Sequence, residues 1–348
     1  MTILSPSYAD YTCEDPWADN VEEQEMHKKV SRVVIPILYS LVFAVGVVGN
    51  SLVLFILLRN HRSRSSTDNF LLHLALADLL MLITFPFAIT EAVVGWKFGD
   101  ALCKVVAAIS RLNFYCSSLL LGCISIDRYL SIIYAIHTFR KRSIDTVHYS
   151  CFIVWIISFL LSVPNMFVLK TYQMGNHTAC TYSQTHFRSN PWWQTGRFVN
   201  HIVGFLLPLI IMTVCYSHII TTLCRSPRRE KKKAVRVAIV ITGVFFLCWT
   251  PFNVVVFLDT LDQYQLIGSC AVKNNLPIAI PVTELFGYVH CCLNPLLYAF
   301  VGAKFRKDAL KVLKHMGCFK SSVFARVSTV SRRSSTTESE SRTVISTI

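Results

Sequence analysis

Long apolar runs dominate the chain and recur seven times between residues 33 and 301. Each run is about as long as the ~20 residues that a helix needs to cross the hydrocarbon core of a bilayer. The runs occupy residues 33–58, 70–92, 104–134, 147–169, 198–224, 235–259 and 277–301. This pattern predicts an all-α membrane protein built as a bundle of seven transmembrane helices.

Prolines interrupt the interior of most of these runs, at Pro86, Pro164, Pro208, Pro251, Pro281 and Pro295. A proline inside a helix removes one backbone donor and leaves one carbonyl without its partner. In a membrane bundle, neighbouring helices can satisfy the group that is left over. We therefore expect kinked helices rather than breaks in the bundle.

Charge is distributed unevenly between the connections. Residues 1–32 carry seven acidic side chains against three basic ones and contain no apolar run that resembles a cleavable signal peptide. The connections after the first, third and fifth runs are basic, as in RSPRREKKKAVR at 225–236. Because basic loops remain cytoplasmic, we expect a multi-pass plasma-membrane protein with an extracellular N-terminus and a cytoplasmic C-terminus.

The amino-acid composition argues against a water-soluble protein and against a protein that binds nucleic acid. A chain of 348 residues with 53% hydrophobic and 16% charged residues is too apolar for a water-soluble protein. The net charge of +14 lies largely in the predicted cytoplasmic edges, where it faces anionic lipid. We therefore expect contact with membrane lipid and no nucleic-acid partner.

The thirteen cysteines divide by compartment. Only Cys13, Cys103, Cys180 and Cys270 fall on the outer, oxidising side, and four cysteines allow three pairings. One of them, Cys103 with Cys180 and Cys13 with Cys270, would tie the N-terminal segment to the last outer loop. Asn176 begins the one glycosylation sequon, Asn-His-Thr, in a predicted outer loop.

The two ends of the chain differ from the bundle between them. Residues 1–32 form an acidic extracellular segment and 33–301 the transmembrane domain. Residues 303–316 alternate apolar and basic side chains, which is typical of a short amphipathic helix on the inner membrane surface. Residues 317–348 form a Ser/Thr-rich cytoplasmic tail that we expect to be disordered, with Cys318 as an acylation candidate. Its hydroxyl groups are either phosphorylation targets or inert.

Ionisable residues inside the runs are rare and costly, so each is a functional hypothesis. They are Asp78, Arg111, Asp127, Arg128 and Glu284, with Glu91 and Asp259 at the outer rims. At ~1.5 Å per residue, Arg111 lies ~25 Å from Arg128 along one helix. The chain therefore has an outer charged layer and an inner one.

Seven short motifs, one for each run, resemble a rhodopsin-like G-protein-coupled receptor. They are Gly49-Asn50, LALAD ending at Asp78, Asp127-Arg128-Tyr129, Trp155, Pro208 with Tyr216, CWTP at 248–251 and NPLLY at 294–298. WKFG at 96–99, DRYLSII and HCCLNPLLYAFVGAKFR are similar to chemokine receptors. SSTDNFLLHLALAD and FLLPLIIMTVCYSHI are most similar to the CXC subgroup, and especially to its third receptor.

The resemblance implies a basic CXC chemokine as ligand. The acidic N-terminus would steer and hold it, with Tyr8 and Tyr11 as sulfation candidates, and the ligand's own N-terminus would enter the bundle. The implied contacts are Glu91, Trp96, Arg111, Asp259 and Glu284. Glu91 and Asp259 could instead be plain rim charges, and Arg111 could pair with Glu284 or meet an acidic ligand group. Ala88 and Asn165 depart from relatives, which often have Trp and an acidic residue there.

Deeper in the bundle, the resemblance implies a sodium site and an activation switch. Asp78, Asn113, Ser117 and Asn294 match sodium ligands of the superfamily, although a hydrated polar cluster is the alternative. Trp249 and Pro251 would form a pivot. Arg128, Tyr216 and Tyr298 would form the inner gate, in which Asp127 holds Arg128 at rest and Tyr129 and Pro295 complete the motifs. No cofactor other than sodium is implied.

The resemblance also implies a signalling function. Chemokine binding would activate an inhibitory-class heterotrimeric G protein and drive leukocyte chemotaxis, with arrestin and receptor kinases acting at the tail. The alternative is a receptor that scavenges chemokine without G-protein signalling. A transporter is disfavoured because no repeated halves are visible. An enzyme is disfavoured because no nucleophile–base pair or metal-binding motif is present, so we expect no catalysis.

Overall fold

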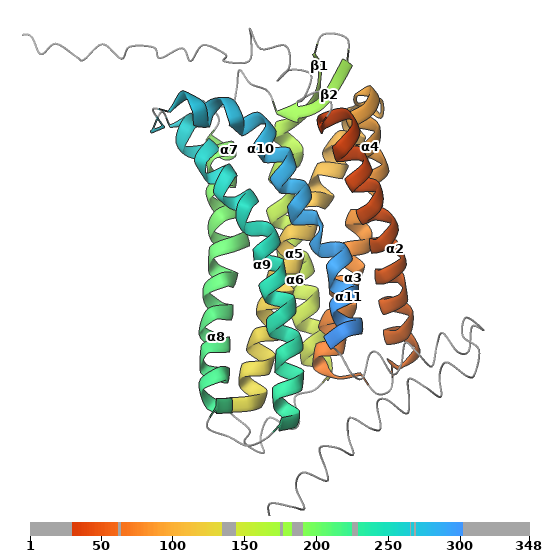
Figure 1. The fold of residues 1–348 in the computed structure, drawn as a ribbon, viewed down its shortest axis with the longest axis vertical. Coiled ribbons are helices and arrows are strands. Elements are labelled where there is room, and N and C mark those ends of the chain that lie inside the picture. Colours follow the sequence, from red (N-terminus) through yellow and green to blue (C-terminus); the bar gives the residue numbers. More distant parts are fainter. Residues whose placement is uncertain are drawn as a thin grey trace, which may run out of the picture.

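The described part of the chain is a bundle of long helices that run roughly along one axis (Figure 1). The computed structural model describes residues 30–61, 64–133, 144–174, 177–182, 191–224, 229–264, 266–267 and 269–301. The elements are η1 (Val30–Val34), α2 (Ile35–Arg59), α3 (Ser66–Leu82), α4 (Phe85–Val94), α5 (Gly99–Ile133), α6 (Ile144–Val168), β1 (Leu169–Met174), β2 (His177–Tyr182), α7 (Pro191–Val199), η5 (Asn200–Leu206), α8 (Leu207–Cys224), α9 (Arg229–Gln263), α10 (Cys270–Tyr288) and α11 (His290–Val301).

Six helical stretches among the described residues are long and apolar enough to cross a membrane. They are Arg32–Arg59, Ser66–Val94, Gly99–Ile133, Thr146–Phe167, Thr195–Cys224 and Val235–Asp262. The seventh predicted run corresponds to α10 and α11, which are interrupted at Val289 and carry Lys273, Glu284 and His290. These polar side chains and the break keep this stretch below the hydropathy of the others, but α10 and α11 complete the predicted seven-helix bundle.

Two prolines show how neighbouring helices satisfy the carbonyls that they leave over. Pro208 cannot donate to the carbonyl of Gly204, and the hydroxyl of Ser118 on α5 donates to that oxygen at 2.7 Å. Pro295 cannot donate to the carbonyl of Cys291, and the amide of Asn50 on α2 donates to it at 2.7 Å. Each proline is thus coupled to a polar side chain on another helix.

Irregular backbone accompanies the prolines in α3–α4 and in η5–α8. The chain leaves the helix at Ile83–Thr84, and α4 begins at Phe85 with Pro86 next, so the second predicted run is divided into α3 and α4. The π-helical stretch η5 ends at Leu206, directly before α8 and its Pro208. These local departures are the forms that the expected helix distortions take at these two sites.

A β-hairpin at one end of the bundle did not follow from the apolar pattern. Strands β1 and β2 pair antiparallel, with Thr171 opposite Cys180. Figure 1 shows the hairpin at the same end of the bundle as α4. The distribution of charge between the loops predicts that this end is extracellular. The hairpin therefore lies where a ligand from outside would arrive.

The core is centred on aromatic side chains between α5, α9 and α10. Trp249 is 2% exposed and its ring centroid lies 4.7 Å from that of Phe114. Gly287 allows this packing, because a Cβ there would come within 2.9 Å of the Trp249 ring. Close packing in this region couples a movement of α9 to a movement of α10.

Several predicted features lie outside the described residues. They are Tyr8, Tyr11 and Cys13 in the N-terminal segment, Asn176, the amphipathic helix predicted at 303–316, Cys318 and the tail at 317–348. These assignments stay predictions.

Candidate functional site

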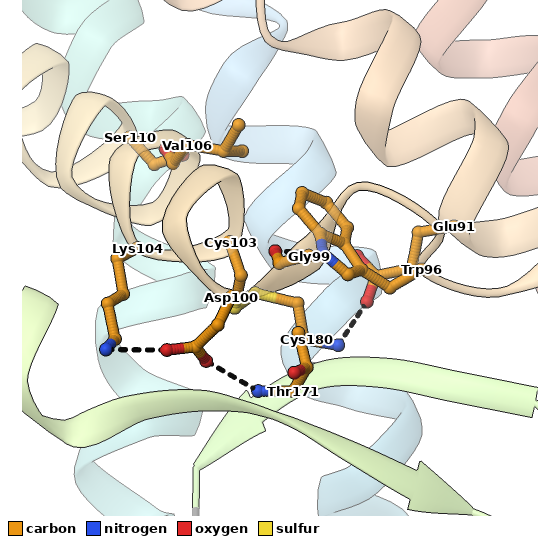
Figure 2. The surroundings of a disulfide bond; sticks show 10 residues. All are labelled: Glu91, Trp96, Gly99, Asp100, Cys103, Lys104, Val106, Ser110, Thr171 and Cys180. Atoms are coloured by element: carbon orange, nitrogen blue, oxygen red, sulfur yellow. Dashed lines mark hydrogen bonds and ion pairs between the residues drawn. A yellow bond between two sulfur atoms is a disulfide. The ribbon is translucent and has the colours of Figure 1, made fainter.

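The outer layer is tied together by a disulfide between Cys103 near the start of α5 and Cys180 on β2 (Figure 2). Their Cα atoms are 5.6 Å apart. This bond confirms one predicted pairing. Cys270 is also disulfide-bonded, but its predicted partner Cys13 lies outside the described residues, so that second pairing stays a prediction.

Glu91 forms a hydrogen bond to strand β2 of the hairpin, at the cysteine that forms the disulfide. Its Oε1 accepts a hydrogen bond from the backbone N–H of Cys180 at 2.8 Å, and Figure 2 shows this contact beside the disulfide. The side chain is partly buried rather than fully exposed at the rim. The structure therefore gives Glu91 a positioning contact, to which any contact with ligand would be additional.

Trp96 also fixes the hairpin. It is 2% exposed, its backbone N–H donates to the carbonyl of Thr178 at 2.6 Å, and its indole N–H donates to the carbonyl of Gly99 at 2.8 Å. Its ring packs with Cys103 and Leu169 in a small separate core. Trp96 therefore lies beneath the hairpin, and its predicted contact with ligand stays a prediction.

A carboxylate on α5 adds a fourth link to the hairpin. Asp100 Oδ1 accepts from the backbone N–H of Thr171 at 3.1 Å, and Asp100 Oδ2 lies 2.7 Å from Nζ of Lys104 (Figure 2). Lys104 is one helical turn after Asp100, so the two side chains lie on the same face of α5. Their ion pair holds the carboxylate in the position where it accepts from Thr171. The hairpin is thus held on α5 by a covalent bond and by a hydrogen bond from Asp100.

Asp259, another predicted ligand contact, is paired within the protein. Its Oδ2 lies 2.5 Å from Nη1 of Arg197 on α7, and both side chains are largely buried. The same Arg197 nitrogen donates to Oγ1 of Thr260 at 3.1 Å. A cationic ligand group would therefore compete with Arg197 for Asp259.

Arg111 and Glu284 each contact polar or aromatic side chains of the bundle. Arg111 Nη1 donates to Oδ1 of Asn200 at 3.4 Å, and its guanidinium carbon lies 5.9 Å from the Phe252 ring centroid. Glu284 Oε1 accepts from the hydroxyl of Tyr288 at 2.9 Å. The predicted alternatives for Arg111, a pairing with Glu284 or a contact with an acidic ligand group, stay predictions.

Between the outer and inner charged layers lies a middle layer, which consists of Asp78 and its polar neighbours. Asp78 lies at its centre and is fully buried. Its Oδ1 accepts from the amide of Asn113 at 3.3 Å, and its Oδ2 accepts from the amide of Asn294 at 2.9 Å. The Oδ1 atoms of Asn113 and Asn294 and the hydroxyl of Ser117 are buried without a hydrogen-bond partner. One carboxylate with three unsatisfied neutral oxygens is a donor set that fits sodium.

The predicted pivot, Trp249, connects the middle layer to the outer one. Its ring centroid lies 5.6 Å from that of Phe252 and 5.5 Å from that of Tyr288. Its indole N–H donates to Nδ1 of His290 at 3.2 Å. Pro251 lies two residues later inside α9. A displacement of the outer aromatic residues would therefore press directly on Trp249.

The inner layer contains the predicted lock. Arg128 Nη2 lies 2.7 Å from Oδ2 of Asp127, and the aspartate is 5% exposed. The Tyr216 hydroxyl is 3.3 Å from Oγ1 of Thr242 on α9, and Tyr298 is buried at 2% exposure. The ring of Tyr129 packs against His218 with centroids 6.0 Å apart. The Asp127–Arg128 contact is the one predicted for the resting state.

Sequence reasoning missed the contacts by which several polar residues organise these layers. Asn50 and Ser118 satisfy proline-released carbonyls, Tyr288 holds Glu284, and His290 lies between Asp78 and Trp249. For Asn50 and Ser118, the signal was the prolines on other helices. For His290, it was a titratable side chain four residues before Asn294.

Comparison with known proteins supports the class that these layers define. Residues 49–298 match the family described as 7 transmembrane receptor (rhodopsin family). The helical bundle, the buried Asp78 and the inner ion pair thus belong to a rhodopsin-family seven-transmembrane receptor.

Individual relatives narrow the assignment. The chain is 46% identical over 321 residues to C-X-C chemokine receptor type 5 of Homo sapiens, covering 90% of this chain and 86% of the relative. It is 40% identical over 317 residues to type 3 of Bos taurus (90% and 85%) and 37% over 309 residues to type 1 of Oryctolagus cuniculus (88% and 87%). The chain belongs to the C-X-C chemokine receptors and is a multi-pass plasma-membrane protein. The expected likeness to the third receptor is present, and identity to the type 5 receptor is higher.

Proposed function

We propose that this receptor binds a basic CXC chemokine at its outer face and activates an inhibitory-class heterotrimeric G protein, thereby directing leukocyte chemotaxis. The observation that carries the proposal is the Asp127–Arg128 ion pair at the inner end of α5, because it provides a state that ligand binding can release. No covalent chemistry is part of this function.

The ligand would engage the receptor in two places. The acidic N-terminal segment, with Tyr8 and Tyr11 sulfated, would capture the basic chemokine by charge. The chemokine's N-terminus would then reach the layer of Glu91, Asp259 and Glu284. Arg197 already neutralises Asp259, so a cationic chain terminus that displaces Arg197 would loosen α7 from α9. This exchange of partners is the first step of our proposed mechanism.

The signal would pass inward through Trp249. Packing against Phe252 and Tyr288 makes the indole responsive to the outer layer, and the proline-bearing helix α9 can swing at this level. The hydrogen bond between Tyr216 and Thr242 joins α8 to α9 near the inner end. Movement of α9 would break this bond. Arg128 would then leave Asp127 and face the G protein.

Sodium would favour the resting state in this scheme. Asp78 would supply the charge, and Asn113, Ser117 and Asn294 would supply neutral oxygens that lack partners in the structure. The unsatisfied oxygens support this proposal, because buried polar atoms without partners are destabilising. Arrestin and receptor kinases would act on the tail at 317–348.

A calcium-flux screen of receptor-bearing cells against a panel of CXC chemokines tests the proposal. We expect a response to at least one ligand in cells with the native receptor and its loss in R128A, with both receptors at the cell surface. Chemokine uptake without calcium or G-protein activation in native cells would instead support the scavenging alternative. Failure to bind any CXC chemokine would refute the ligand class.

A further inference from the structure

Three different metal-ligating side chains meet in the middle of the bundle. Asp78 on α3 and His290 and Cys291 on α11 are each fully buried, and their ligating atoms all lie within 4.8 Å of one another. His290 Nε2 is 3.5 Å from Asp78 Oδ1 and 3.6 Å from Cys291 Sγ. This group shares Asp78 with the oxygen-rich set described above, but it adds a nitrogen and a sulfur.

Two of the three separations between these atoms match the edges of a tetrahedral metal centre. With Zn–N and Zn–O bonds of ~2.05 Å and a Zn–S bond of ~2.3 Å, tetrahedral angles give an N–O edge of ~3.4 Å and an N–S edge of ~3.6 Å. The observed separations between His290 Nε2 and its two neighbours are 3.5 and 3.6 Å. The two measured edges therefore fit zinc with little movement.

His290 has Nε2 available for a metal when its ring proton is on Nδ1. Nδ1 lies 2.7 Å from the carbonyl oxygen of Gly287, a contact that is favourable only when Nδ1 carries a proton. In the neutral ring, Nε2 then presents a lone pair toward the Asp78 carboxylate. Two acceptors that face each other at this distance repel each other unless a positive charge, either a metal ion or a proton on Nε2, lies between them. A backbone carbonyl that orients a histidine in this way is a common outer partner of metal ligands.

We infer that Asp78, His290 and Cys291 bind a borderline-soft divalent cation, with zinc as the best match. On binding, the Cys291 thiol releases its proton to solvent, and the thiolate and the Asp78 carboxylate balance the two positive charges of the metal. A neutral site suits a buried position in the membrane. The buried oxygens of Asn294, Asn113 or Ser117 are available for a fourth ligand.

This site differs from a sodium site in the ligands that it requires. Sodium is a hard cation that takes oxygen ligands, whereas thiolate and imidazole select zinc and similar metals. Metal binding at this site does not require a particular chemokine. It requires only the contact between α3 and α11 that brings Asp78 and His290 together.

Metal binding would be coupled to the pivot through the two nitrogens of His290. Nδ1 also lies 3.2 Å from the indole nitrogen of Trp249, which must donate in that contact. Nδ1 cannot donate to Gly287 and accept from Trp249 at the same time. A metal on Nε2 fixes the proton on Nδ1, so the bond to Gly287 persists and Trp249 loses its acceptor. Metal loading thereby changes the resting contacts of Trp249.

Metal analysis of the purified full-length receptor tests the inference. Because the ligands are buried, the receptor is expressed in zinc-supplemented medium, purified and dialysed before zinc is measured by mass spectrometry. We expect the native receptor to retain zinc in a ratio near one to one, and D78N, H290N and C291S to lose it. C292S is the matched control, because Cys292 is the adjacent thiol and its Sγ donates to the carbonyl of Val289.

Cobalt provides a test that does not depend on how well the variants fold. Replacement of zinc by Co²⁺ in the native receptor should give a sulfur-to-cobalt charge-transfer band, which C292S retains. The indole N–H resonance of Trp249 should also shift when metal is removed by chelation. Stabilisation of the native receptor by sodium without retained zinc or cobalt, or equal zinc in the native receptor and C291S, would overturn the inference.

Discussion

The side-chain amide of Asn50 donates a hydrogen bond to the carbonyl oxygen of Cys291, and that oxygen is the one that Pro295 leaves without a backbone donor. The bond joins the first transmembrane helix to the last. It also places Asn50 next to Cys291, which is one of the metal ligands that we propose. A side chain that carries no charge thus maintains the arrangement in which the charged ones meet.

Replacement of Asn50 by alanine should destabilise the receptor. The Asn50 amide also donates to the carbonyl of Gly46 at 3.0 Å, so N50A removes two hydrogen bonds and leaves the Cys291 carbonyl buried without its donor. We expect a loss of about 1–3 kcal/mol, seen as a lower melting temperature in detergent. S51A changes the neighbouring exposed residue and should melt like the native protein. Equal melting of N50A and S51A would contradict this role.

Gly49 should not tolerate even a methyl group. A Cβ at Gly49 would lie 2.8 Å from Cβ and 2.9 Å from Cγ of Pro295, and a proline ring cannot rotate away. G49A should therefore push α2 from α11 and destabilise the fold by about 1–3 kcal/mol. G122A is the control, because nothing lies within 4 Å of a Cβ there. Thermal unfolding should rank G122A at or above the native receptor and G49A below it, and the reverse order would disprove the packing argument.

Glu91 allows a positioning role to be separated from direct contact with ligand. Glutamine keeps an oxygen that can accept from the Cys180 N–H, whereas alanine removes it. If Glu91 mainly holds the hairpin, E91Q should bind chemokine within about threefold of the native affinity and E91A should lose about tenfold or more. V93A, an exposed position in the same helix, serves as the control. Equal losses in E91Q and E91A would show instead that the negative charge meets the ligand.

Removal of the charge on Asp127 should raise activity in the absence of ligand. The Asp127–Arg128 contact at 2.7 Å is a charge-assisted hydrogen bond, and such bonds contribute about 1.5–3 kcal/mol. D127N should therefore increase ligand-independent guanine-nucleotide exchange. We expect an increase of about tenfold or more where the pair is lost completely. S131A removes a hydrogen bond to the Arg128 carbonyl without touching the ion pair and should leave exchange unchanged. Unchanged exchange in D127N would mean that this pair does not hold the resting state.

The helices and the inner ion pair followed from the sequence because hydropathy and local order determine them. A run of ~20 apolar residues has few alternatives to a transmembrane helix, and Asp127 and Arg128 are adjacent in the chain. The pairing of Cys103 with Cys180 was one of the three that the four outer cysteines allow. In each case the physical constraint acts within one segment or on very few residues.

The hairpin and the partners of the outer charges could not be found in this way. The strands Leu169–Met174 and His177–Tyr182 have no long apolar run, and their position depends on contacts with Glu91, Trp96 and Asp100 from other segments. Asp259 was expected to face the ligand, but its pairing with Arg197 depends on how α7 meets α9. Such contacts are decided by the packing of helices, which periodicity does not specify.

The bond from Ser118 to the carbonyl of Gly204 has a consequence for attempts to make this receptor more robust. In a soluble helix, replacing an internal proline by alanine restores a missing backbone bond and usually increases stability. Here P208A would supply a second donor to an oxygen that Ser118 already satisfies, so little would be gained. It would also place a new backbone donor just after the π-helical stretch Asn200–Leu206. Engineering for thermostability should therefore begin at lipid-facing or loop positions and leave the proline–hydroxyl pairs intact.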